Sequence, residues 1–268
     1  MLLDFDFYFL LYLLLLLCIG STLTAITYRW QLFAEYEWRK EAHEFLELPY
    51  YEPEPLKFSK GRSICSHCKH TLGPLELIPL LSYLLQRGRC RHCHSHIALR
   101  YPLIEVTTAV LLAPLYWLNL SLQEWILLGV LMSALICAMI IDAERYWLPD
   151  ECSFVVLCCA TGLFHLSDQS QILENVSAGL FAYFFIYFMR YVFLKLKKIE
   201  AIGLGDAKLL AVLVYWLGGT SLIAIMLIAS LLGIVGALLT GKIKDNKIPF
   251  GPYLIVAALS YFYSGYYL

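Results

Sequence analysis

The chain has 268 residues, of which 60% are hydrophobic and 15% are charged, whereas an average soluble domain is about half apolar and about a quarter charged. This surplus of apolar residues excludes a soluble enzyme, a disordered tail and a secreted disulfide scaffold. The 20 Lys and Arg residues nearly balance 21 Asp and Glu residues, so net charge gives no reason to expect a nucleic-acid partner.

The first apolar run covers residues 7–27. Asp4 and Asp6 precede it, and no basic residue occurs before Arg29. A secretory signal peptide requires a positively charged start and a cleavage site of small residues. We therefore expect this run to be a retained transmembrane helix that anchors the chain in a lipid bilayer.

A polar stretch at 29–101 follows, and it is long enough for a domain outside the membrane. Seven further apolar runs come after Pro102, so the chain offers about eight candidate transmembrane helices. Two of these runs, 152–166 and 207–218, are shorter than a full span and require tilting or extension by neighbouring residues. The seven runs are 103–119, 124–142, 152–166, 173–194, 207–218, 221–240 and 251–267.

The distribution of basic residues predicts the orientation of these helices. With both termini outside, the loops 29–101, 143–151, 195–206 and 241–250 lie in the cytoplasm and carry the Lys and Arg residues of the loops. The outer segments then carry only acidic residues, namely Asp4, Asp6, Glu124, Asp168 and Glu174. The opposite orientation would violate the positive-inside rule at each loop.

Four cysteines in the polar stretch form two CxxC knuckles, Cys65-Ser66-His67-Cys68 and Cys90-Arg91-His92-Cys93. Each knuckle can bind one side of a tetrahedral ion, and four thiolates close a structural Zn²⁺ site. A reducing cytoplasm argues against disulfides. Nearby histidines leave a mixed Cys/His ligand set open. We assign the metal to architecture, because a small domain with few large apolar residues gains folding free energy from it.

Two carboxylates at the ends of apolar runs are candidates for chemistry. Asp142 ends the run before Pro149, and Asp206 begins a run in the sequence Gly203-Leu204-Gly205-Asp206. The topology places both at the cytoplasmic face, where a pair could share a proton and hydrolyse a peptide bond through an activated water. For either aspartate alone, a solvated helix end is an equally good interpretation.

Neighbouring residues would support such a site. Gly203 and Gly205 permit unusual backbone dihedrals and close helix approach, so Asp206 can lie tightly against a neighbour. Lys208 is either an interfacial lysine that extends toward water or a cation that keeps Asp206 ionised. Asp150 and Glu151 are better suited to capping the next helix than to chemistry.

Five stretches, in this order, resemble the type IV prepilin peptidases, membrane aspartic proteases with a GxGD signature. They are GSTLTAITYR at 20–29, the two knuckles together with LELIPLLSYLLQRGRCRHC and RYPLIE, IDAERYWLPD at 141–150, GLGDAKLLAVLVYWLGG at 203–219, and IPFGPYL at 248–254. By this resemblance Asp142 and Asp206 match the catalytic positions. Gly88 matches a position linked to methyl transfer.

The resemblance implies cleavage of type IV prepilins or type II secretion pseudopilins after a glycine, at the cytosolic face of the bacterial inner membrane. It also implies N-methylation of the new amino terminus with S-adenosylmethionine. The expected fold is an all-α polytopic membrane protein of about eight transmembrane helices, with a small cytosolic zinc-binding domain between the first two. The expected divisions are 1–28, 29–101 and 102–268, the last being the peptidase domain.

Two other functions remain as alternatives. A non-enzymatic membrane scaffold could use the zinc module to bind a pilus or secretion assembly partner. A proton-coupled transporter would also place carboxylates in the membrane, but it is disfavoured because the acids gather at one face and no internal repeat is evident.

Overall fold

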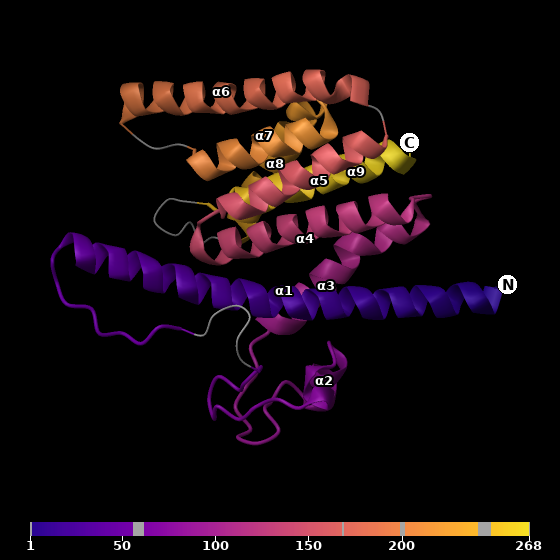
Figure 1. Ribbon diagram of the computed structural model, residues 1–268, viewed down its shortest axis with the longest axis vertical. Helices are drawn as coiled ribbons and strands as arrows, with labels where there is room; N and C mark the ends of the chain where they lie inside the picture. The colour runs from indigo at the N-terminus through magenta and orange to yellow at the C-terminus, as the bar shows by residue number, and fades with distance from the viewer. Residues whose placement is uncertain (1, 56–61, 168, 199–201, 241–247, 268) are drawn as a thin grey trace. The chain divides into compact units, whose positions relative to one another are not determined.

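The computed structural model describes residues 2–55, 62–167, 169–198, 202–240 and 248–267 (Figure 1). The chain divides into two compact units, Met1–Tyr116 and Trp117–Leu268. Within the described ranges the regular elements are helices, and the extended pairing consists of two isolated bridges beside the cysteine knuckles. Each of the eight expected apolar runs forms a helix, which confirms the all-α prediction.

The first unit begins with the long helix α1 (Leu2–Phe45), which continues well beyond the apolar run at 7–27. The continuation has a simple cause, because residues 29–45 contain neither Gly nor Pro and include four Glu, two Ala and two Arg, which favour helix. The first proline after this segment is Pro49. The polar stretch at 29–101 therefore starts as a helical extension of the first predicted span.

Helix α1 packs against α3 (Arg100–Leu112) through small residues. A Cβ on Gly20 would lie 2.8 Å from the Cα of Glu105, so only glycine permits this approach. Nearer the start of α3, the Arg100 guanidinium donates to the carbonyl of Thr24 over 3.2 Å and to Oγ1 of Thr27 over 2.9 Å. The two helices are thus joined by close contact and by buried polar bonds.

Between α1 and α3 lie the cysteine knuckles and two short helices, η1 (Pro74–Leu77) and α2 (Leu81–Leu85). The carboxylate of Glu105 on α3 is buried, and its Oε2 accepts a hydrogen bond of 2.9 Å from the backbone N–H of Leu80. This bond ties α3 to the turn before α2. A short helix, η2 (Ala113–Trp117), follows α3.

The second unit contains six longer helices: α4 (Leu122–Arg145), α5 (Asp150–Leu166), α6 (Ile172–Lys197), α7 (Leu204–Leu217), α8 (Ser221–Thr240) and α9 (Gly251–Tyr267). A short helix, η3 (Gln169–Gln171), precedes α6. Helix α4 begins with a capping box, in which Ser121 and Glu124 each satisfy the other's backbone N–H.

Helix α7 is the centre of the second unit. It contacts α6 on one side and α5 and α9 on the other, and Figure 1 shows α6 as an outer layer beyond α7. On α6, a Cβ at Gly179 would lie 2.8 Å from the carbonyl oxygen of Ala211, so the two helices approach closely. This placement fully buries a row of apolar side chains on α7, including Leu209, Leu210, Leu213 and Val214.

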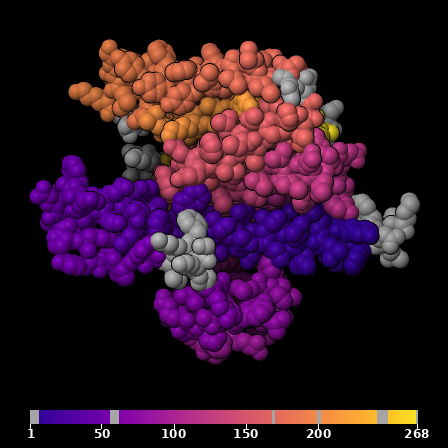
Figure 2. Space-filling view, in the orientation of Figure 1, coloured from indigo at the N-terminus to yellow at the C-terminus, as the bar shows by residue number. Residues whose placement is uncertain are grey.

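Among the described residues, four helices are long and apolar enough to cross a bilayer: Phe7–Phe45, Leu122–Arg145, Ile172–Lys197 and Ser221–Leu239. Large apolar side chains are exposed on the outward faces of these helices, in a number that is unusual for a soluble protein. Figure 2 shows the exposed surface of α6. On α6 these side chains include Phe181, Phe184, Phe185, Tyr187 and Phe188. The chain is therefore a multi-pass membrane protein.

The predicted count of eight spans remains a prediction. Helices α3, α5, α7 and α9 have only 13, 17, 14 and 17 residues. Most of the predicted loop at 241–250, with its three lysines, lies outside the described residues, as does Asp168.

Candidate active site and metal centre

Asp142 lies in the last turn of α4, and its side chain is buried, with 5% exposed. The helix ends three residues later because Tyr146 adopts a left-handed conformation (φ 57°) and Pro149 follows. The N–H of Tyr146 still bonds to the carbonyl of Asp142 over 2.9 Å. The carboxylate is therefore fixed at the end of a rigid helix.

Asp206 lies in the first turn of α7, which begins after Gly203. A Cβ on Gly203 would lie 3.1 Å from Oδ2 of Asp206, so the carboxylate lies against the start of its own helix. Gly203 has an ordinary extended backbone (φ −69°), and the unusual dihedrals expected from the sequence do not occur there. The carboxylate is partly buried at the helix start.

Leu148, in the loop between α4 and α5, brings the two aspartate-bearing segments together. A Cβ on Gly205 would lie 3.0 Å from the Cβ of Leu148, and one on Gly251 would lie 3.1 Å from its Cδ2. Gly205 thus provides the close approach expected from the sequence. The end of α4, the start of α7 and the start of α9 thus meet around Leu148.

Gly251, the first residue of α9, is a site residue that sequence reasoning missed. Its backbone N–H donates to Oδ2 of Asp142 over 3.0 Å, and a Cβ on it would lie 2.7 Å from the same oxygen. The signal was present in the segment IPFGPYL, where a glycine opens a helix before Pro252. The sequence did not predict that the start of this helix lies against Asp142.

Lys208 has a different partner from the one considered from the sequence. Its Nζ lies 2.6 Å from Oδ2 of Asp150, the first residue of α5, in a largely exposed ion pair. Asp150 does lie in the first turn of α5, as expected. The pair joins the starts of α5 and α7 beside the aspartates.

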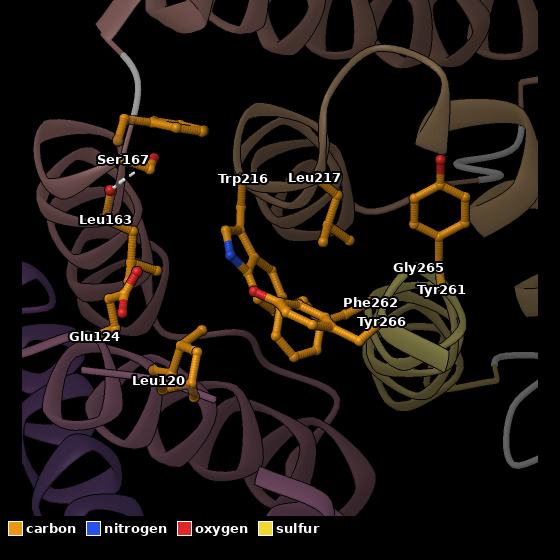
Figure 3. Close-up of a pocket in the computed structure, with 12 residues that line it drawn as sticks. Leu120, Glu124, Leu163, Ser167, Trp216, Leu217, Tyr261, Phe262, Gly265 and Tyr266 are labelled. Atoms are coloured by element: carbon orange, nitrogen blue, oxygen red, sulfur yellow. Dashed lines mark hydrogen bonds between the residues drawn. The ribbon is translucent and has the colours of Figure 1, made fainter. Parts of the chain in front are cut away.

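A cavity of about 310 Å³ lies at the other end of the same helices (Figure 3). It is lined by Glu124 in the first turn of α4 and by Trp216 near the end of α7. At 1.5 Å per residue, Glu124 is about 27 Å along α4 from Asp142. This cavity is therefore not part of the aspartate site.

The two cysteine knuckles have the same backbone conformation. In each, the N–H of the first cysteine bonds to the carbonyl five residues later, and the N–H four residues later bonds back to that cysteine. Cys65 pairs in this way with Lys69 and His70, and Cys90 with His94 and Ser95. Lys69 and His94 occupy equivalent left-handed positions, with φ of 58° and 56°.

The four sulfur atoms fit a tetrahedral metal ion. All four Sγ atoms lie within 4.8 Å of one another, and those of Cys65 and Cys93 are 3.8 Å apart. Zinc–sulfur bonds of about 2.3 Å in a tetrahedron require sulfurs about 3.8 Å apart.

Gly88 lies two residues before the second knuckle, in a tight turn. Its φ is +67°, its N–H donates to the carbonyl of Tyr83, and its own carbonyl accepts from Ile97. A Cβ there would lie 2.8 Å from the Tyr83 hydroxyl. These contacts explain why glycine is needed. They supply no carboxylate for a sulfonium or ribose, so we derive no chemical step through a methyl donor.

Two family models match the chain. The Bacterial Peptidase A24 N-terminal domain matches residues 14–119, and the Type IV leader peptidase family matches residues 129–238. No solved structure matches the chain.

Curated relatives cover most of the chain. A prepilin leader peptidase/N-methyltransferase of Aeromonas hydrophila is 36% identical, over 93% of this chain and 88% of its own. The protein of the same description from Pseudomonas putida is 34% identical, over 90% and 85%. A type 4 prepilin-like proteins leader peptide-processing enzyme of Escherichia coli O78:H11 is 36% identical, over 92% and 90%. This chain therefore belongs to the type IV leader peptidase family.

Proposed function

We propose that this protein removes the leader peptide from type IV prepilins or type II secretion pseudopilins, with Asp142 and Asp206 as the catalytic pair. The observation that supports the proposal is that the end of α4, which carries Asp142, and the start of α7, which carries Asp206, lie around the same residue, Leu148. Family membership and the descriptions of the relatives support the same reaction.

The pair suits hydrolysis by an activated water without a covalent intermediate. One carboxylate takes a proton from water as the water attacks the scissile carbonyl carbon, and the other donates a proton to the carbonyl oxygen. The N–H of Gly251 donates to Oδ2 of Asp142 and orients the carboxylate, whose remaining acceptor positions can contact water or substrate. Two neighbouring carboxylates divide these roles by sharing a proton.

The site is proposed to face the cytosol at the bacterial inner membrane, with the cut after a glycine of the leader. This orientation rests on the distribution of basic residues, which places the 143–151 and 195–206 loops inside. Both aspartates lie next to these loops. A leader with basic residues would remain on the same side as the carboxylates.

The first unit is proposed to methylate the new amino terminus with S-adenosylmethionine, as the relatives' descriptions suggest. The four cysteines would hold Zn²⁺ as a structural ion, with no position left for substrate. The ion would connect the two knuckles through their four thiolates. It would thereby stabilise the segment that contains Gly88.

The test is cleavage of a prepilin by the detergent-purified full chain, with the product read by mass. Asp142→Asn and Asp206→Asn should each abolish loss of the leader, because each removes a proton donor or acceptor. Asp150→Asn is the matched control, since this nearby carboxylate pairs with Lys208 and should retain cleavage. A further gain of one methyl with S-adenosylmethionine would establish the second activity.

Cleavage by either asparagine variant at the wild-type rate would refute the aspartate mechanism. Leader loss without methylation would leave a peptidase only. If the wild type did not cleave where an established peptidase does, the scaffold function would replace the enzymatic one.

A further inference from the structure

A second group of metal-ligating side chains lies beside the zinc knuckles and outside the four thiols. It consists of His70, Glu76 and His92, whose donor atoms all lie within 4.8 Å of one another. His70 follows the first knuckle, His92 lies inside the second, and Glu76 comes from η1. The ring centroids of the two histidines are 3.6 Å apart.

Glu76 is held in a conformation that directs one oxygen at the histidines. Its side chain is only 11% exposed, and Oε2 accepts a hydrogen bond of 2.8 Å from the backbone N–H of Gly73. Oε1 is buried and has no hydrogen-bond partner among the described residues. It lies 3.9 Å from Nε2 of His92, which is too far for a hydrogen bond.

A buried carboxylate oxygen without a partner is costly, and a cation would satisfy it. We propose that His70, Glu76 and His92 bind a second divalent transition-metal ion, of the type that favours imidazole ligands. Two histidines and one glutamate are a known ligand set for zinc, with the fourth position open to water. The N–H of Gly73 donates to the other oxygen of the Glu76 carboxylate and so fixes its orientation, as residues that hydrogen-bond to metal ligands commonly do.

The donor atoms lie within 4.8 Å of one another and must draw closer to bind one ion, and the rings of His70 and His92, whose centroids are 3.6 Å apart, must turn away from each other. Ligand bonds of about 2.0–2.1 Å in a tetrahedron place donor atoms about 3.4 Å apart. The 3.9 Å between Glu76 and His92 would shorten by a few tenths of an ångström. His92 is 46% exposed, so an ion has a path from solvent and room for a water ligand.

The proposed ion would join the same two knuckles as the thiolates do. His70 is two residues beyond Cys68, and His92 lies between Cys90 and Cys93. One ion would link the knuckles through sulfur and the other through imidazole. The second ion would have an open position, which a structural four-thiolate site lacks.

The experiment counts metal in the full chain, purified in detergent, loaded with Zn²⁺ and freed of excess ion. We expect about two zinc ions per chain in the wild type and about one in Glu76→Gln, His70→Gln or His92→Gln. Loading with Co²⁺ distinguishes the sites, because only the thiolate site gives intense thiolate-to-cobalt absorption. That absorption should persist in the variants.

His67→Gln is the matched control, because His67 occupies in the first knuckle the position that His92 occupies in the second. It should retain about two ions. The proposal holds if at least one of the three ligand variants retains the thiolate absorption with about one ion fewer than wild type. Every other result overturns it. A single ion in the wild type, for example, would show that His70, Glu76 and His92 bind no metal and that Glu76 and His92 are only neighbours. Neither result depends on peptidase activity.

Discussion

The backbone N–H of Gly251 donates a hydrogen bond to Oδ2 of Asp142 over 3.0 Å, across 109 positions of sequence. Gly251 is the first residue of α9, so this N–H is one of the amides that an α-helix leaves without an internal partner. The start of α9 therefore acts as a fixed donor that orients the carboxylate at the end of α4.

A Gly251→Ala substitution should reduce prepilin cleavage by about 10²-fold. The added methyl group would displace the carboxylate of Asp142, and a displacement of up to about 1 Å in a reacting group can have an effect of this size. The added Cβ would lie 2.7 Å from Oδ2 of Asp142 and 3.1 Å from Cδ2 of Leu148. The turnover of a prepilin substrate measures the effect. Gly265→Ala on the same helix is the control, since nothing lies within 4 Å of its added Cβ. Equal activity of the two variants would contradict the proposed role of Gly251.

Removal of the Lys208 charge should have only a small effect. Lys208→Met breaks the ion pair with Asp150. The Lys208 side chain is 43% exposed and the Asp150 side chain is 67% exposed, and ion pairs at such exposed positions contribute about 0–1 kcal/mol to stability. Cleavage should fall by less than about tenfold. The exchanged variant, Lys208→Asp with Asp150→Lys, should recover part of the loss. A complete loss in Lys208→Met would show that the lysine acts on Asp206 directly.

A Gly88→Ala substitution should reduce methylation more than leader cleavage. Its φ of +67° costs about 1–2 kcal/mol with a Cβ present, and the Tyr83 hydroxyl must also move. The measurement is product mass with S-adenosylmethionine, scored for both reactions. Gly73→Ala serves as the comparison, because its backbone is extended and its Cβ would meet Glu76 at an ordinary 3.6 Å. If both variants methylate equally, the turn at Gly88 does not matter for this reaction.

Loss of one thiolate should remove the structural ion and loosen the knuckles. Cys90 is buried, so Cys90→Ser should abolish thiolate-to-cobalt absorption and increase proteolysis within the cysteine segment. Cys158→Ser, an exposed cysteine on α5, should leave both unchanged. Retention of the cobalt absorption in Cys90→Ser would exclude the four-thiolate assignment.

Much of the helical architecture followed from local sequence. Seven of the eight apolar runs became α-helices because they carry no proline beyond the first turn, whereas Pro114 ends α3 at Leu112 within the run 103–119. Pro149 and Gly203 mark helix ends that the structure has. Hydrophobicity does not predict the extension of α1 to Phe45. That part of the helix is polar, and only its propensity reveals it.

The cysteine cluster was predicted well because a CxxC knuckle is a local unit with a fixed backbone, and two units need only meet. The choice between four sulfurs and a mixed Cys/His shell needed the structure. It places the four Sγ atoms together and gathers His70 and His92 with Glu76 instead.

The aspartates illustrate both limits. Their positions at helix ends came from the sequence, because a run of apolar residues broken by Pro or Gly defines where a helix stops or begins. Their partners did not, because a hydrogen bond between residues 109 positions apart depends on how helices pack. The same holds for Lys208, which the sequence offered as an interfacial lysine or as a partner of Asp206, and which the packing of α5 and α7 pairs with Asp150.

The sequence by itself determined the helices, the membrane character and the pairs of thiols, since these depend on composition and on contacts a few residues apart. Only the tertiary structure decided that Gly251 binds Asp142 and that Leu148 packs against both Gly205 and Gly251. It also decided that Glu76 lies beside His70 and His92. Those relationships arise from close packing of distant segments, where a change of one methyl group determines which atoms can meet.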